Sequence, residues 1–199
     1  MSLVSQIRPA LVITLLMTLL LGVGYPVAVT WIAHIAFPRQ AEGSLIRDEH
    51  GQVIGSALIA QAFTKAEYLH PRPSAAGNDG YDASGSSGSN LGPLNPDLAK
   101  RVAKDADALR KDGAQGPIPA DALTTSGSGL DPAVSPANAR MQAQRIAAAR
   151  GAPLSAVQKV IDDHTTHPAL GLLGQPAVNV LEVNLALDAT LPKAHPPAS

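Results

Sequence analysis

Two copies of one serine- and glycine-rich loop are the first residues whose types and spacing suggest chemistry. SGSNLGPLNP, at residues 87–96, and SGSGLDPAVSP, at residues 126–136, share Ser-Gly-Ser, a following leucine and a polar residue before proline. Such a loop ahead of a helix can bind phosphate through backbone amides. However, a P-loop requires Gly-Lys-Ser/Thr, and neither loop contains lysine. Pro96 and Pro136 also remove one amide donor each, so nucleotide binding here is disfavoured.

A second pattern, Leu-Ser-x-x-Gln at residues 154–158, loosely resembles the nucleotide-contacting signature loop of ABC-type ATPases. The same two polar residues also fit a Ser-x-x-Gln capping box, in which each side chain bonds the other's backbone amide at a helix start. The capping box accounts for both residues, so we favour it. Ser155 and Gln158 are retained as candidate nucleotide contacts.

The histidines and serines indicate no catalytic site. His164 and His167 have an H-x-x-H spacing that suits zinc, but no third ligand is evident in the sequence, so a surface pair is favoured. His70 lies in the stiff sequence HPRP, and no serine lies in a G-x-S-x-G motif. We therefore predict no catalytic residue and no metal site.

Composition argues against two further kinds of function. The 199 residues include 15 basic and 16 acidic side chains, so the chain lacks the basic surplus typical of nucleic-acid-binding proteins. The chain has no cysteine, which excludes disulfides and thiolate metal sites.

The elements that must position these residues begin with a long apolar segment. Residues 9–37 contain no acidic or basic side chain apart from His34, and about 20 apolar residues suffice to cross a bilayer. The apolar region of a cleaved signal peptide spans only about 7–15 residues. We predict a short cytoplasmic tail over residues 1–9 and a transmembrane helix in the membrane lipid over residues 10–37. Basic residues flank both ends, so charge barely discriminates the orientation.

Small residues give this helix a face. They recur every four positions in two stripes, which would let another helix approach closely; the stripes are Thr14, Thr18 and Gly22, and then Gly24 and Ala28. Pro26 removes a backbone hydrogen bond and predicts a bend.

The rest of the chain predicts a small α+β domain over residues 38–189. Residues 44–63 read as a β-hairpin with Gly51 in the turn, and residues 68–96 read as one long loop. Residues 176–188 fit either a strand or a helix capped by Asn179, and we leave both open. Residues 190–199 are expected to be a disordered tail.

Both repeated loops lead into helices. Asn95 and Ser135 are expected N-caps, each followed by a proline at the first helical position, and the second helix is expected to end at Gly151. A plain linker has no need of capping residues. The loops are therefore better explained as shaped surfaces than as linkers.

At this point several long motifs resemble the KdpC family, the small single-span component of the Kdp potassium-transporting P-type ATPase complex. In chain order, after a single predicted span, they are YLHPRPSA, GSNLGPLNP, TTSGSGLDPAVSPANA and GQPAVNVLEVNLALD, and the resemblance covers residues 5–189. It implies a bacterial inner-membrane complex with a channel-like potassium-selecting subunit and a P-type ATPase subunit. It also implies a cytoplasmic N-terminus and a periplasmic main domain.

The resemblance implies an accessory role, described for the family as that of a catalytic chaperone that raises the ATP affinity of the hydrolysing subunit. The chain lacks the DKTGT motif that carries the aspartyl-phosphate of P-type ATPases, so no catalysis is expected. No cofactor is expected to bind firmly, and ATP is expected only through the complex. We favour a role in assembly or at the entry side of the channel-like protein.

In this interpretation the repeated loops dock on partner subunits. The candidate docking residues are Gly88, Asn90, Gly92, Gly127, Gly129 and Asp131. The alternative is an independent membrane-anchored periplasmic binding module or enzyme. That alternative requires a pocket of convergent polar groups, which the sequence does not indicate.

The length of the apolar segment predicts that the mature protein keeps its N-terminus. N-terminal sequencing of the membrane-bound protein is expected to begin at or near Met1. A sequence that begins near Pro38 would show cleavage and contradict this prediction.

Overall fold

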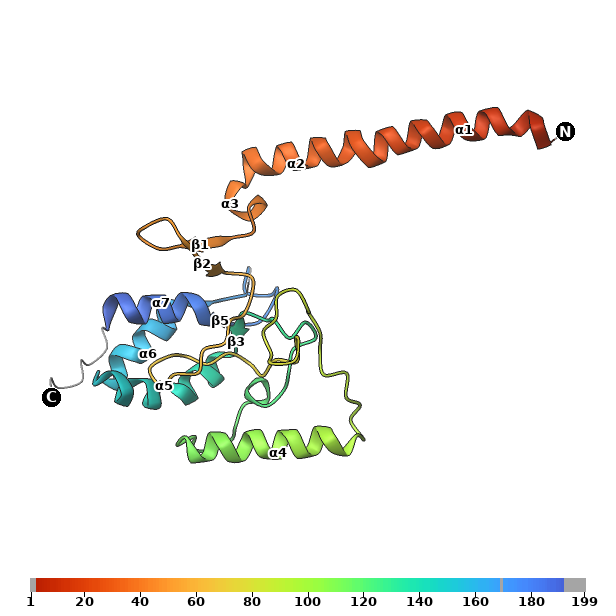
Figure 1. Cartoon of the computed structure of the whole chain (residues 1–199). Coiled ribbons are helices and arrows are strands. Elements are labelled where there is room, and N and C mark those ends of the chain that lie inside the picture. Colours follow the sequence, from red (N-terminus) through yellow and green to blue (C-terminus); the bar gives the residue numbers. More distant parts are fainter. Residues whose placement is uncertain (1–2, 169, 192–199) are drawn as a thin grey trace. The chain divides into compact units, whose positions relative to one another are not determined.

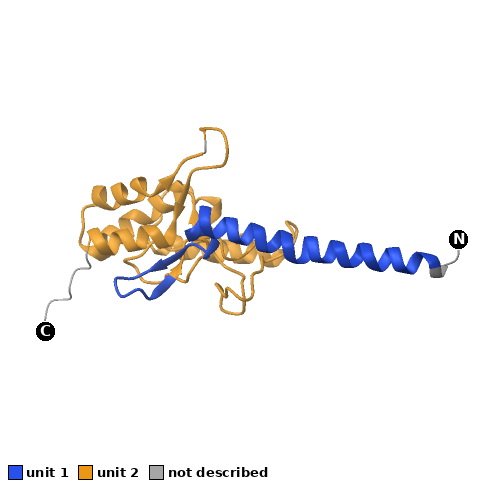
Figure 2. Cartoon of the chain, turned by 90° about the horizontal axis from the view of Figure 1, so that it is seen from above, with its two compact units in different colours: residues 1–54 blue, residues 55–199 orange. Residues whose placement is uncertain are grey.

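The computed structural model describes residues 3–168 and 170–191, which belong to two compact units. Unit 1 comprises Met1–Ile54 and unit 2 comprises Gly55–Ser199 (Figure 2). Unit 1 is dominated by one long apolar helix, and unit 2 combines helices with short strands (Figure 1). This is the predicted fold class.

The long helix of unit 1 consists of α1 (Leu3–Leu19), a π-helical turn η1 (Leu20–Gly24) and α2 (Tyr25–Ala36). Within its stretch Ser5–Ala36, an 18-residue window has a mean hydropathy of 2.2 and no buried residue, so the helix is long and apolar enough to cross a membrane. Directly before Pro26 the helix forms a π turn, in which the Tyr25 amide bonds to the Leu20 carbonyl, and the bend at Pro26 stays a prediction. Pro26 has no backbone N–H, and the π turn lies next to this gap in the hydrogen-bond pattern. The helix then continues as α2 (Figure 1).

A short helix, α3 (Pro38–Ala41), leads to the predicted hairpin of β1 (Leu45–Arg47) and β2 (Val53–Ser56). In its turn the Asp48 side chain accepts hydrogen bonds from the amides of His50 (2.9 Å) and Gln52 (2.8 Å). Gly51 has a φ of +78°, which glycine adopts without strain. The hairpin prediction is confirmed for residues 45–56, whereas residues 57–63 of the predicted range belong to no strand.

Unit 2 is built on an antiparallel sheet in the order β3 (Ala133–Val134), β5 (Ala177–Asn179), β4 (Thr165–Thr166). In its register Val134 pairs with Val178, which pairs with Thr165 on the other side. Helices α5 (Pro136–Arg150), α6 (Leu154–Asp163) and α7 (Val180–Thr190) surround a core of small aliphatic side chains. Its largest fully buried hydrophobic members are Leu69, Ile146, Val157, Ile161, Val178, Val180, Val183 and Leu187.

Helix α4 (Pro96–Lys111) contributes no buried residue and lies at the lower edge of unit 2 in Figure 1. The side chains of its predicted apolar face, Leu98, Val102, Ala106 and Leu109, are half-buried. Between α4 and β3 lies one short 3₁₀ turn, η2 (Ala120–Ala122).

The predicted helix ends are mostly confirmed. The Asn95 side chain accepts from the Asp97 amide at 2.8 Å, and Ser135 Oγ accepts from the Asn138 amide at 3.1 Å. Gly151 ends α5 with a φ of +62°. The two alternatives for residues 176–188 both hold in part, because strand β5 ends at Asn179 and Asn179 then caps α7.

Two predictions at helix ends are wrong, namely the capping box of Ser155 and Gln158 and the placement of Thr190 in a tail, whereas the predicted start of the third helix at Leu154 is confirmed. Helix α6 begins at Leu154 because the carbonyl of Pro153, itself extended, accepts the Ala156 amide at 3.0 Å. Ser155 therefore lies inside the first turn, and no side chain caps this helix. Thr190 is the last residue of α7, not part of a tail, and residues 192–199 lie outside the described residues.

The segment at residues 66–74 begins with a turn at residues 66–67, belongs to no helix or strand, and runs between α5 and α7. We call it the extended segment. Buried carboxamide side chains take the place of strand neighbours. Asn184 of α7 accepts from the Leu69 amide (2.7 Å) and donates to the Leu69 carbonyl (2.9 Å). Gln142 of α5 does the same for His70, at 2.8 and 3.1 Å. Each carboxamide thus satisfies one residue's donor and acceptor together.

Arg150 fixes the start of the same segment. Its side chain is fully buried, and its guanidinium donates to the carbonyls of Glu67 (2.8 Å), Leu187 (3.1 Å) and Leu191 (2.7 Å). Its Nη2 atom forms an ion pair with Asp188 Oδ1 at 2.8 Å. The planar fork therefore ties the segment to the last turn of α7.

We expect Asn184→Leu to destabilise the chain severely, because it removes both bonds to Leu69 while preserving side-chain size. Leu69 would keep a buried amide and carbonyl without partners, which costs about 2–5 kcal/mol in total. Thermal unfolding of the full chain in mild detergent, followed by circular dichroism, measures the loss. The control Asn95→Ala removes one exposed N-cap and is expected to cost only about 1 kcal/mol. Equal losses of stability in the two variants would contradict this role of the Asn184 hydrogen bonds to Leu69.

Candidate functional site

The two repeated Ser-Gly-Ser loops contact each other. The Ser87 amide donates to the Ser128 carbonyl at 2.9 Å, and Ser86 Oγ donates to the same carbonyl at 3.0 Å. Ser74, at the end of the extended segment, donates from its Oγ to the Gly129 carbonyl at 2.6 Å. The loops therefore form one paired surface, which we call the twin-loop surface (residues 86–92 and 126–131).

Glycine is required where the loops meet. Gly129 is buried with a φ of +67°, and a Cβ there would collide with the Ser87 carbonyl and lie 2.8 Å from the Ala76 amide nitrogen. A Cβ at Gly88 would lie 3.0 Å from the Gly127 carbonyl oxygen. Two of the four predicted docking glycines, Gly88 and Gly129, therefore permit the close approach of the two loops.

Arg72 braces the second loop. Its guanidinium donates to Asp131 at 3.0 Å and to the Thr125 carbonyl at 3.3 Å. The other oxygen of Asp131 accepts from the Ala133 amide at 3.0 Å. Tyr81 donates from its hydroxyl to the Arg72 carbonyl at 2.8 Å, and burial raises the pKa of this phenol. Asp131 thus has a structural role within the loop.

The other three predicted docking residues face outward. Asn90 is exposed with a φ of +51°. Gly92 and Gly127 are exposed, and a Cβ at either position would meet no atom within 4 Å. The six predicted residues therefore divide into three that hold the surface together and three that it displays.

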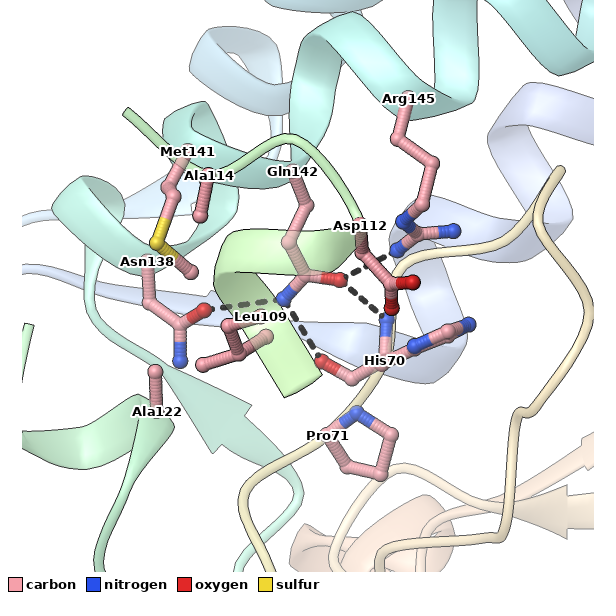
Figure 3. A pocket seen from close by; sticks show the side chains of 10 residues that line it. All are labelled: His70, Pro71, Leu109, Asp112, Ala114, Ala122, Asn138, Met141, Gln142 and Arg145. Carbon is pink, nitrogen blue, oxygen red and sulfur yellow. Dashed lines mark hydrogen bonds between the residues drawn. The ribbon is translucent and has the colours of Figure 1, made fainter. Parts of the chain in front are cut away.

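A small cavity of about 50 Å³ lies between the end of α4, helix α5 and His70 (Figure 3). That volume holds only a few water molecules. Figure 3 shows Gln142 at its centre, bonded to Asn138 at 2.9 Å and to Arg145 at 2.7 Å. The carboxamides are thus occupied by one another and by the backbone of His70.

Burial beside this cavity favours the neutral form of His70. Burial, together with the nearby Arg145, lowers the pKa of His70, although a hydrogen bond with the Lys65 carbonyl and the Asp112 charge act in the opposite direction. Burial likewise lowers the pKa of Arg145, with Asp112 opposing. This arrangement is a hydrogen-bonded support for the extended segment rather than a set of reacting groups.

Ser155 and Gln158 lie on α6, away from a capping role. Ser155 is exposed, and Gln158 lines a shallow groove with Arg140, Met141 and Gln144. Arg140 forms an ion pair with Asp162 at 2.8 Å. The groove therefore offers polar groups, but its arginine already has a carboxylate partner.

Of the predicted histidine pair, His164 Nδ1 bonds to the carbonyl of Val160 at 2.8 Å, one turn back. Among residues 3–168 and 170–191, no group of three His, Cys, Asp or Glu side chains is arranged to hold a metal ion.

One of the two predicted stripes of small residues lines a shallow groove on the membrane helix. Thr14, Thr18 and Gly22 line it together with Ile13, Met17 and Leu21. Gly24, the last residue of the π turn, and Ala28 in α2 lie outside this lining. A second groove on α2 is lined by Pro26, Val27, Thr30, Trp31 and His34.

Sequence reasoning missed the residues that position the extended segment, which in turn holds the twin-loop surface. Gln142, Asn184 and Arg150 are polar yet 7% exposed or less. A polar residue on the apolar face of a helix was the available signal, because Asn184 lies between Val183 and Leu187 in the core. Its partner in the extended segment carries no sequence signal.

Comparison with known proteins identifies the family. Residues 7–189 match the family model described as KdpC, the K⁺-transporting ATPase c chain. A potassium-transporting ATPase KdpC subunit of Caulobacter sp. strain K31 is 63% identical over 96% of both chains. The KdpC subunit of Beijerinckia indica is 57% identical over 97% of this chain and 98% of its own length. That of Mycobacterium tuberculosis strain H37Ra is 53% identical over 92% and 97%.

The matches cover the membrane helix, the extended segment and both repeated loops together. The chain is therefore a membrane-anchored accessory subunit of an ATPase complex, and it belongs to the KdpC family of potassium-transporting ATPase subunits.

Proposed function

We propose that this subunit supports assembly of the Kdp complex and the coupling of ATP hydrolysis to potassium import, through docking of its twin-loop surface on a partner subunit. The partners are the channel-like potassium-selecting subunit and the P-type ATPase subunit. The membrane helix contributes a second contact, for which the groove of Thr14, Thr18 and Gly22 supplies room for a close helix approach.

One observation carries this proposal. The inner side of the twin-loop surface is held by hydrogen bonds to the rest of unit 2, and its exposed side displays residues without bulky side chains. Gly129 and Asp131 fix the two loops from within unit 2, whereas Asn90, Gly92 and Gly127 project no bulky side chain outward. A surface that is ordered before binding loses less conformational entropy on binding. Such a surface suits recognition through backbone groups.

The proposed location is the bacterial inner membrane, with the N-terminus in the cytoplasm and the main domain in the periplasm. Family resemblance supports this orientation, and charge alone does not decide it. In this orientation cytoplasmic ATP cannot reach unit 2, so the domain would act on the entry side of the channel-like protein.

A second candidate function is direct contact with ATP through Ser155 and Gln158, in keeping with the chaperone role described for the family. The observation in its favour is that no capping box engages these two residues. Against it, the neighbouring Arg140 is paired with Asp162, and none of the lining residues supplies a free lysine for phosphate. We therefore keep docking as the preferred function.

We expect Gly127→Val to leave the fold of the chain intact and to impair potassium-dependent ATP hydrolysis by the complex. A Cβ at this position meets no atom of the chain within 4 Å, so a valine adds bulk mainly to the displayed surface. Thermal unfolding of the chain and ATPase assays of the purified complex provide the two readouts. Ala103→Val, an equally exposed change on α4, is the matched control.

Gly129→Val gives the contrasting result, because its collision with the Ser87 carbonyl and its positive φ destabilise the chain itself. Normal ATPase activity and normal potassium dependence in the Gly127→Val complex would contradict docking by this surface.

We expect Gln158→Ala and Ser155→Ala to leave both thermal stability and the ATP requirement of the complex unchanged. Neither side chain caps α6, so no cap is lost. The ATP concentration that gives half-maximal hydrolysis is the measurement, with Gln144→Ala in the same groove as control. An increase of about tenfold in that concentration for Gln158→Ala alone, equivalent to about 1.4 kcal/mol, would support the nucleotide contact.

A further inference from the structure

The loop between β4 and β5 displays three leucines to solvent. Leu170, Leu172 and Leu173 are 92%, 86% and 66% exposed. We call residues 170–174 the leucine loop; it is the light-blue segment that leads into β5 in Figure 1. A contiguous exposed apolar group of this kind marks an interaction site more often than a scattered surface leucine does.

The loop is held firmly at its base and shaped at its tip. Thr166 pairs with Ala177 in the sheet, and Thr166 Oγ1 donates to the Ala177 carbonyl at 3.0 Å. At the tip Leu170 has a φ of +55°, an unfavourable conformation for a residue with a Cβ. Gly171 and Gly174 also have positive φ. Backbone strain of this kind is concentrated at binding sites.

The composition of the loop argues against a bilayer as its occupant. Residues 168–176, PALGLLGQP, contain no lysine, arginine, tryptophan or tyrosine. Segments that lie at a membrane interface use basic residues for anionic headgroups and aromatic rings for the interfacial belt. The leucine loop supplies apolar contact only, which suits a dry pocket in a protein.

Its size argues against a second copy of this chain. A specific interface that forms between free proteins buries at least roughly 1,200 Å² of total surface, more than three leucines can supply. A partner already held beside the chain needs much less, because tethering raises the effective concentration of the second contact. The membrane helix provides such a tether within the complex to which this family belongs.

We propose that the leucine loop inserts into an apolar pocket on another subunit of the Kdp complex. The inference rests on the proposed docking role, but it assigns a contact that does not involve the twin-loop surface.

The first test is co-purification of Leu172→Ser with the partner subunits. Burial of one leucine contributes enough free energy to change a dissociation constant by about tenfold, so we expect about a tenfold loss of the chain from the complex. Leu58→Ser, at a leucine that is 60% exposed elsewhere in unit 2, is the matched control. Thermal unfolding of both variants is expected to match that of the unsubstituted chain. Co-purification of Leu172→Ser at the control level would overturn the proposal.

The second test identifies the occupant. Because the chain has no cysteine, Leu172→Cys can be labelled at that position alone with an environment-sensitive fluorophore. We expect a blue shift of its emission in the assembled complex in lipid nanodiscs, and none for the labelled chain alone in the same nanodiscs. A blue shift of the chain alone would assign the loop to the bilayer, a concentration-dependent shift would assign it to a second copy, and either result would overturn the proposal.

The two docking proposals fail separately. If Gly127→Val impairs the complex while Leu172→Ser does not, the leucine loop is excluded and the twin-loop surface stands. The reverse result supports the leucine loop and removes the twin-loop surface.

Discussion

The fold of unit 2 depends on how the extended segment satisfies its backbone. Residues 66–74 cross the centre of the unit without strand partners, yet Leu69 at their middle is fully buried. A buried amide or carbonyl without a partner is strongly unfavourable. Asn184 removes that cost for Leu69, and Gln142 removes it for His70. Arg150 donates to the carbonyl of Glu67 at the start of the segment. With few aromatic side chains in the chain, polar clamps take over part of the positioning that bulky core residues usually perform.

The extended segment also holds the twin-loop surface in place. Beyond His70 the chain continues to Arg72 and Ser74, and these two residues hold the second repeated loop through Asp131 and Gly129. The first loop is then held by the second, through Ser87 and Ser128. A surface without strands or helices of its own is thus connected to the core by a continuous series of hydrogen bonds.

Local signals in the sequence predicted local structure well. The Gly51 turn and the caps at Asn95 and Ser135 each depend on residues within one turn of one another, and the structure confirms them. The long apolar helix depends on one uninterrupted run of residues, and the structure confirms it too. The capping box at Ser155 failed for a local reason too, because Pro153, two residues before Ser155, occupies the N-cap position. The contacts between the two loops and the clamps of Asn184 and Gln142 join residues far apart in the chain. Their partners are backbone groups, which every residue possesses, so side-chain identity could not reveal them.

The π turn gives the membrane helix a property that a uniform helix lacks. In an α-helix successive residues are about 100° apart around the axis, and one extra residue in a turn rotates all that follows by a comparable angle. The residues that line the groove of α2, Pro26, Thr30 and His34, continue the four-residue spacing of Thr14, Thr18 and Gly22. Residues four apart drift by about 40° per step around a regular α-helix, and the slower winding of the π turn between the two sets opposes that drift. A series of residues spaced by four can in this way stay closer to one side of the anchor than it would on a regular α-helix. A single span then offers one neighbouring helix a longer line of contact.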